Sequence, residues 1–253
     1  MKISWSGGGF LVLALAFAVF FPPHAHAGSD SSLAPSLDAL RDAVYDSRPP
    51  GEVETLAQSL AKAAESPAPD DIDRTLSLSR IEYFVARSWN ESGDKKKAIS
   101  HFEAAVEYAR LSMESGEHPA GLMALIKPLS ELCLLKDMGF LVANGPKIPQ
   151  IAKKILAMEP GHAGATITLS AAKAYPPAIF GGNPEEAIEE LSPYLAAQGS
   201  SLAKDELFDI RMCLGTAAAR LNRKAEARAW FTAALELYPR NAQALRERDK
   251  AKP

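Results

Sequence analysis

The chain has 253 residues, of which 47% are hydrophobic and 23% are charged, so it has enough apolar side chains for a sizeable core and is not a disordered protein. Its formal net charge of −3 at pH 7 argues against nucleic acid or anionic lipid as the main partner, because both require clusters of lysine and arginine.

The first 27 residues have the pattern of a secretory signal peptide. Lys2 supplies a positive charge, residues 10–21 form an apolar stretch, and Ala25-His26-Ala27 matches the small-residue cleavage pattern. The alternative is a membrane anchor, but this stretch is shorter than the roughly 20 residues that span a bilayer as a helix. We therefore expect export, most simply to the bacterial periplasm, with no stable insertion in a membrane after cleavage. Gly28 rather than cysteine follows the predicted cut, so the sequence does not predict a lipid anchor there.

The mature chain divides into two parts. In residues 28–69, apolar side chains recur at helical spacing from Leu37 and again from Val53, with Pro49-Pro50-Gly51 as a turn between them. This pattern predicts a linker followed by a helical hairpin that caps the fold. Residues 70–253 are predicted to form a helical repeat domain that ends in a short polar tail.

Residues 211–239 predict two helices that cross closely. In order, a large apolar residue and a small one on the first helix are followed by alanine, an aromatic residue, alanine and a terminal proline on the second. The small side chains let the helices approach, the aromatic ring fills the gap, and the proline stops the second helix. This segment resembles the 34-residue tetratricopeptide repeat. The residues that carry the resemblance are Leu214, Gly215, Ala227, Phe231, Ala234 and Pro239.

Three further helix pairs precede this repeat. One covers residues 82–110, and its second helix is predicted to continue to Gly116. The next ends at Pro160 and has an enlarged turn around Phe140, and another spans residues 163–195. In the first of these copies the matching residues are Ala86, Trp89, Gly93, Ala98, Phe102 and Ala105.

The resemblance implies an all-α fold, in which antiparallel helix pairs stack into a right-handed superhelix. The middle of the chain is also similar, more weakly, to the T component of tripartite periplasmic transporters, a family of helical-repeat lipoproteins. From that second resemblance we take the fold alone, since the chain lacks the lipoprotein cysteine.

A segment rich in helix breakers, Y-P-P-A-I-F-G-G-N-P-E-E-A from residue 175, interrupts the helical pattern. Its prolines end one helix, and its glycines supply the unusual backbone angles of a turn. The next helix is expected to begin with an asparagine cap and a proline, and Glu186 can complete a capping box. The side chain of Phe180 either packs beneath the following repeat or is displayed on the concave face, and we favour the first. The residues with loop and cap roles are Phe180, Gly181, Gly182, Asn183 and Pro184.

The sequence contains no motif typical of catalysis or metal binding. It has no G-x-S-x-G, H-E-x-x-H or phosphate-loop pattern, and His101, His118 and His162 are widely separated. Cys133 and Cys213 fall in apolar runs on helices two repeats apart, which favours free buried thiols over a disulfide. We therefore expect neither an enzyme nor a bound cofactor or metal.

The predicted function is protein binding. Stacked helix pairs hold an extended peptide or a helix of another protein on their concave face, which the first helices line, so the expected partner is another envelope protein or a peptide. For each polar residue there, surface solvation is the alternative role. The alternative function is a small-molecule component of an uptake system, with the turns near Phe140 and Phe180 closing an apolar pocket. The polar residues predicted on the concave face are Arg87, Asn90, Lys173, Arg211 and Arg220.

The predicted signal peptide gives the first testable prediction. Expression in a bacterium with a secretion system should yield a mature chain that begins at Gly28, because the cleavage pattern ends at Ala27. Mass spectrometry of the intact protein measures this directly. A retained leader, or a lipidated first residue, would contradict the prediction.

Overall fold

The computed structural model describes residues 34–64 and 71–252, without the side chains of residues 34, 35 and 180, so the predicted signal peptide lies outside the described residues. Within these ranges every regular element is a helix and there is no strand. In chain order the elements are α1 (Ala34–Tyr45), α2 (Pro50–Ala64), α3 (Asp71–Ser92), α4 (Lys95–Leu111), α5 (Pro119–Leu135), α6 (Met138–Asn144), α7 (Lys147–Met158), α8 (Ala163–Ala174), the 3-10 turn η1 (Ala178–Phe180), α9 (Pro184–Gln198), α10 (Lys204–Arg220), α11 (Lys224–Leu237) and α12 (Ala242–Lys250).

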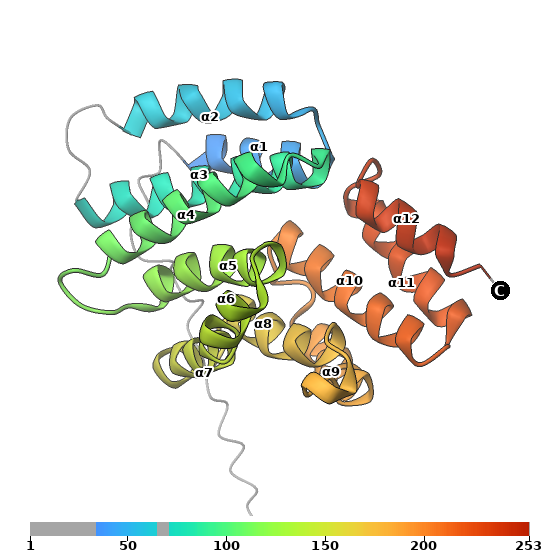
Figure 1. Cartoon of the computed structure of the whole chain (residues 1–253). Coiled ribbons are helices and arrows are strands. Elements are labelled where there is room, and N and C mark those ends of the chain that lie inside the picture. Colours follow the sequence, from blue (N-terminus) through green and yellow to red (C-terminus); the bar gives the residue numbers. More distant parts are fainter. Residues whose placement is uncertain (1–33, 65–70, 253) are drawn as a thin grey trace, which may run out of the picture.

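The helices pack as consecutive antiparallel pairs that stack into a curved array (Figure 1). The first helices of the pairs, α3, α5, α8 and α10, follow the inner side of the curve, where α3 contacts α5 and α8 contacts α10. The second helices, α4, α7, α9 and α11, lie outside them. The predicted all-α superhelix of stacked helix pairs is confirmed.

Close helix crossing explains the small residues of the last pair. A Cβ atom added to Gly215 on α10 would lie 2.6 Å from Cε1 of Phe231 on α11, so only glycine fits against that ring. Leu214, Ala227 and Ala234 are fully buried beside it. The aromatic ring fills the space that the small side chains leave, which is the packing reason for the repeat pattern.

The equivalent residues of the α3–α4 pair take similar places. Ala86, Ala98, Phe102 and Ala105 are buried between the helices. Gly93 has a φ of 92° in the α3–α4 turn, where glycine is favoured. The half-buried side chain of Trp89 donates from Nε1 to Glu54 on α2 at 2.9 Å. The two prolines of the pattern, Pro160 and Pro239, are exposed and follow the ends of α7 and α11.

Helix α4 is shorter than predicted, since it ends at Leu111 and not at Gly116. The side chain of Ser112 donates to the carbonyl of Ala109 at 2.8 Å, and a ring nitrogen of His118 lies 3.1 Å from the Ser112 carbonyl. That carbonyl is therefore occupied by a side chain after the helix instead of by a further helical turn.

The enlarged turn around Phe140 contains a short helix, α6, where the sequence predicted only a turn. Asp137 caps this helix by accepting a hydrogen bond from the Phe140 backbone N–H at 2.9 Å. No residue of α6 is buried. The second pair thus carries an extra helix that contributes little to the core.

The segment after α8 is a compact turn. Gly181 has a φ of 85°, and a Cβ atom on Gly182 would lie 1.8 Å from the Pro176 carbonyl oxygen, so both glycines are required by geometry. Asn183 caps α9 as predicted, but its backbone N–H donates to Lys173, and Glu186 instead accepts from the Asn183 side chain. The side chain of Phe180 lies outside the described residues, so its predicted burial stays a prediction.

The first hairpin packs against the last repeat, which brings the two ends of the array together. The rings of Tyr45 on α1, Phe208 on α10 and Tyr238 after α11 form an aromatic trio whose centroids are 5.0 to 5.3 Å apart. All three are buried, and pairs in this range are favourable beyond the area that they bury. We call this contact between the hairpin and the last repeat the seam.

Hydrogen bonds cross the seam in both directions. The Tyr45 hydroxyl donates to Asp209 on α10 at 3.1 Å, and the Tyr238 hydroxyl donates to Asp42 on α1 at 2.8 Å. Asn241 donates from its side chain to the Tyr45 carbonyl at 2.6 Å and also caps α12. The end of the chain, where the sequence predicted a short polar tail, contains helix α12, and its cap Asn241 contacts the last residue of α1.

Replacing Asn241 by alanine should lower the free energy of unfolding by about 2–4 kcal/mol, because it removes both a helix cap and the donor to a buried carbonyl. Denaturant unfolding measures the change. Gln243→Ala, at an exposed position of the same helix, is the matched control and should change stability by less than about 0.5 kcal/mol. Equal effects would mean that the seam contact contributes nothing.

Candidate functional site

The concave face carries a set of polar and ionisable side chains from α3, α5 and α10 and from the residue that follows α8. They face one another across the narrow inner side of the array, since each lies within electrostatic range of at least one other. We call this set the inner cluster. Its members are Tyr83 and Arg87 on α3, Lys127 and Glu131 on α5, Tyr175 after α8, and Asp209 and Thr216 on α10.

Arg87 joins the inner cluster to the seam. Its guanidinium lies 4.6 Å from the centroid of the Tyr45 ring, which suits a cation–π contact, and it donates a hydrogen bond to the Tyr83 hydroxyl. It also faces Glu131 and Asp209. This arginine, predicted as a binding residue, is thus held in place by the fold.

Two charged side chains of the inner cluster have no such partner. Lys127 and Glu131 lie four residues apart on α5, so they project from one face of that helix. Neither forms a hydrogen bond or an ion pair with another described residue, although Lys127 acts on Asp209 and Glu131 on Arg87 through space. Both are available to an incoming polar group.

Tyr175 adds a large amphipathic side chain to the same face. It follows the last residue of α8, and 45% of its surface is exposed. Its hydroxyl is hydrogen-bonded to Thr216, which places it beside α10. Exposed tyrosines that are fixed in this way are common at binding surfaces.

Desolvation changes the acidity of the cluster's carboxyl groups. Burial raises the pKa of Asp209 from 3.8 to about 6, against the opposing effect of Lys127 and Arg87. Burial also raises the pKa of Glu131, which Arg87 partly opposes. The inner cluster therefore gains protons in a pH range where surface carboxylates stay ionised.

The other predicted binding residues have different surroundings. Lys173 pairs with Glu186 and Glu190 on α9, and Arg211 donates to a carbonyl of α11, so both connect helices within their own pair. Arg220 donates to the Ala174 carbonyl at 2.8 Å and connects α10 to α8. Asn90 is half-buried on α3. The structure thus brings Arg87 alone of the five into the inner cluster.

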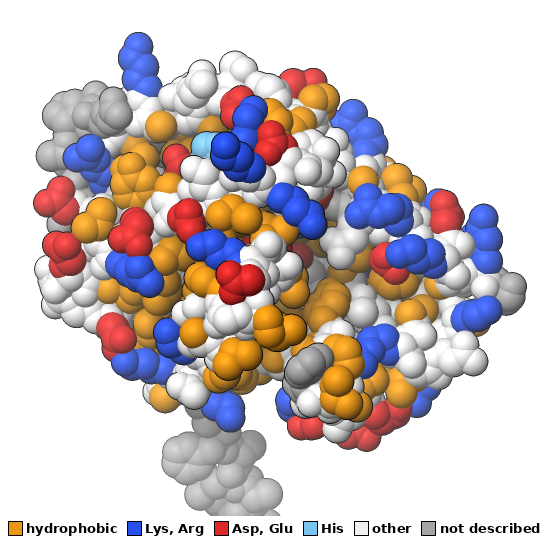
Figure 2. Space-filling view, viewed as in Figure 1, with side chains coloured by type: hydrophobic (Ala, Val, Ile, Leu, Met, Phe, Trp, Pro, Cys, Tyr) orange, Lys and Arg blue, Asp and Glu red, His pale blue; other side chains and the backbone are white. Residues whose placement is uncertain are grey.

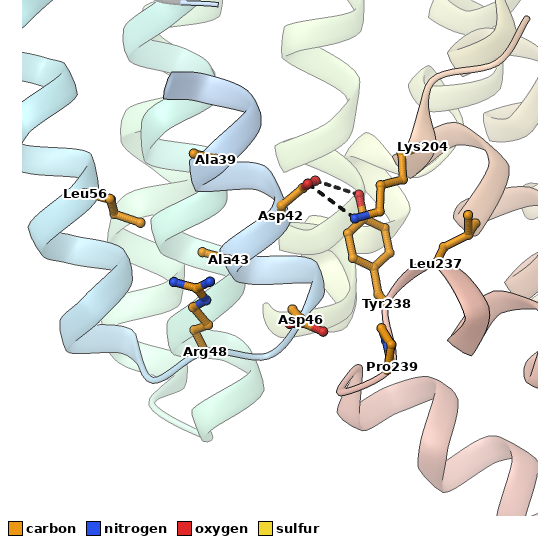
Figure 3. A pocket seen from close by; sticks show the side chains of 10 residues that line it. All are labelled: Ala39, Asp42, Ala43, Asp46, Arg48, Leu56, Lys204, Leu237, Tyr238 and Pro239. Atoms are coloured by element: carbon orange, nitrogen blue, oxygen red, sulfur yellow. Dashed lines mark hydrogen bonds and ion pairs between the residues drawn. The ribbon is translucent and has the colours of Figure 1, made fainter. Parts of the chain in front are cut away.

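A pocket of about 370 Å³ lies at the seam, between α1, α2 and the end of α11 (Figure 3). Its acidic groups are already paired, because Asp42 accepts from Tyr238 and contacts Lys204, and Asp46 pairs with Arg240 at 2.7 Å. Neither this pocket nor a hollow between α3 and α4 is lined by Phe140, which the small-molecule alternative invoked.

The histidines and cysteines have structural surroundings. His118 and His162 cap α5 and α8 by accepting backbone N–H bonds, and His101 pairs with Glu82 at 2.6 Å, which raises the pKa of its ring. Across the part of the chain that the structure describes, no three histidine, cysteine, aspartate or glutamate side chains form a group that could hold a metal ion.

The two cysteines, Cys133 and Cys213, are free and buried, as predicted. Burial raises the pKa of the Cys213 thiol to about 12 and also raises that of Cys133, so both thiols are protonated at neutral pH.

Comparison with known proteins agrees with this geometry. The family model for the tetratricopeptide repeat matches residues 208–241. The chain carries a tetratricopeptide repeat and has the fold of such proteins. The crystal structure of TTC0263, a thermophilic tetratricopeptide-repeat protein of Thermus thermophilus, superposes with a TM-score of 0.52 at 18% identity, covering 87% of this chain and 98% of that one. A comparison with curated proteins found no match.

Most residues of the inner cluster were not predicted from the sequence. A signal was present on α5, whose only charged residues are Lys127 and Glu131 in a mostly apolar helix. Charged side chains at i and i+4 on such a helix must share one polar face. Tyr45 and Asp209 had no comparable signal, because their contact joins opposite ends of the chain.

The raised pKa of Asp209 predicts a pH-dependent stability. The folded state keeps the proton up to about pH 6 and the unfolded state only to about pH 4, so stability is present at low pH and is lost as the pH rises through 6. Asp209→Asn should remove this loss and be more stable than the parent by about 2–3 kcal/mol at pH 8, with no gain at pH 3.5.

Denaturant unfolding from pH 3.5 to 8 measures both curves. Glu189→Gln, which removes an exposed carboxylate on α9, is the control and should follow the parent between pH 5 and 8. Parallel curves for the parent and Asp209→Asn would show that Asp209 is not desolvated.

Proposed function

We propose that this protein is a non-enzymatic interaction protein of the bacterial periplasm, which holds a segment of another envelope protein on its concave face. Tetratricopeptide-repeat proteins generally serve as scaffolds for protein–protein interaction. The signal-peptide pattern of residues 1–27 supports the proposed compartment.

The observation that carries the proposal is that two charged side chains on α5, Lys127 and Glu131, form no direct hydrogen bond or ion pair with another described residue. Both side chains are half-buried, and a partly desolvated charge is stabilised when a ligand supplies a hydrogen-bonding group. Lys127 can donate to carbonyl groups of a bound chain and Glu131 can accept from its amides. The half-exposed ring of Tyr175 supplies apolar contact area beside them.

The partner fits an extended peptide or one helix better than a globular domain. The inner cluster spans the groove from α3 and α5 to α10, because Arg87 and Lys127 both act on Asp209. Side chains of α3 and α5 on one side and of α10 on the other are close enough to interact. The space between these helices therefore suits a single chain segment. The small-molecule alternative stays a prediction for which no cavity among those described above offers support.

The first experiment is to capture the binding partner. The full chain, immobilised and exposed to an envelope extract, should retain a defined protein that mass spectrometry identifies. Tyr175→Ala should then weaken binding of that partner by about 2 kcal/mol or more, as for interface hot spots, while unfolding changes by less than about 1 kcal/mol.

Lys127→Gln should also weaken binding, because it removes an unpaired donor from the groove. Lys96→Gln, on the outer surface of α4, is the matched control and should bind like the parent. If the groove variants and the control bind alike, the concave face is not the binding surface.

A further inference from the structure

The inserted helix α6 exposes apolar side chains that the repeat packing does not use. Met138 and Val142 are four residues apart, so they share one face of the helix, and 62% and 67% of their surfaces are exposed. Leu134, at the end of α5, is 79% exposed. The last pair makes the same connection between its helices with residues 221–223 alone, so α6 is not needed for the turn.

The next helix pair also exposes an apolar side chain at its turn. We call this residue, and the group of Leu134, Met138 and Val142 before it, the apolar tips. Ile179, in the turn between α8 and α9, is 85% exposed. The connections within successive antiparallel pairs lie on the same edge of the array, so α6 and this turn are neighbours on that edge. Figure 2 shows hydrophobic side chains over α6 and over the α8–α9 turn, with a hollow between them.

The segment that carries α6 and α7 is rich in lysine. Residues 134–158 contain four lysines and one aspartate, in a chain whose net charge is −3. The aspartate, Asp137, is occupied as the cap of α6. Lys153 has no partner among the described residues, and Lys147 contacts only the neutral side chain of Asn144. Lys147 and Lys153, on the helix that directly follows α6, therefore lack an acidic partner.

We propose that this edge, with Leu134, Met138, Val142 and Ile179 as its apolar tips and Lys147 and Lys153 as its cations, docks on an anionic phospholipid surface. Protruding apolar side chains beside unpaired lysines suit an interface where the chains enter the acyl boundary and the ammonium groups meet headgroups. Protein partners are usually anchored in pockets, whereas these side chains project from convex tips.

The binding is peripheral. No helix in residues 34–64 and 71–252 is long and apolar enough to cross a membrane. This docking surface is separate from the groove of the proposed function, so either can fail without the other.

A local fluorescent label tests the proposal in the full chain. Because Cys133 and Cys213 are buried, an environment-sensitive nitrobenzoxadiazole label attaches selectively to Val142→Cys or Ile179→Cys. When vesicles of phosphatidylglycerol and phosphatidylcholine are added, the fluorescence intensity of both labels should increase several-fold. Their emission maxima should shift to shorter wavelengths. Leu111→Cys, an exposed apolar position on α4, is the matched control and should not respond.

A second experiment tests the contribution of the lysine charges to vesicle binding. In the labelled Val142→Cys chain, Lys147→Gln and Lys153→Gln should each weaken vesicle partition about fivefold, which corresponds to about 1 kcal/mol per lysine near an anionic surface. Equal responses at positions 142 and 111, or none at 142 and 179, would overturn the proposal. A response to polyglutamate without one to vesicles would also overturn it and would identify a surface for acidic proteins instead.

Discussion

The architecture depends on the burial of Tyr45 between the two ends of the chain. Its ring packs on Phe208 and Tyr238, its hydroxyl donates to Asp209, and its carbonyl accepts from Asn241. Repeat arrays normally have two free ends, each of which needs a polar cap. Here the first hairpin covers the apolar surface of the last repeat, so each end caps the other.

Closing the array also defines its inner face. With the hairpin docked on α10, Arg87 is placed over the Tyr45 ring and within range of Asp209. Charges that would be hydrated in an open groove are partly desolvated, which is why burial dominates the raised pKa values of Asp209 and Glu131. The stability of the seam and the chemistry of the groove are therefore coupled through Tyr45 and Arg87.

Local charge and total charge point to different partners. The net charge of −3 disfavours an anionic surface for the molecule as a whole, yet residues 134–158 are basic and carry exposed apolar side chains. Electrostatic attraction is screened beyond about 8–10 Å at physiological salt, so a docking edge responds to its own lysines more than to distant acids. An inserted helix can thus add a function that the rest of the repeat array does not share.

The sequence by itself determined the helix pairs and their close crossings, because these depend on residues near one another in the chain. Gly215 and Phe231 pack within one repeat, and the caps of α4 and α9 are formed by residues beside them. Only the tertiary structure decided the seam, since Tyr45 and Asp209 are 164 residues apart and no periodic pattern links them. It also decided which predicted residues face the groove, because Lys173 and Arg211 find partners within their own helix pairs, whereas Lys127 and Glu131 find none. Helical periodicity reports which face of a helix is polar, but the partners of a side chain depend on which helices fold back against it.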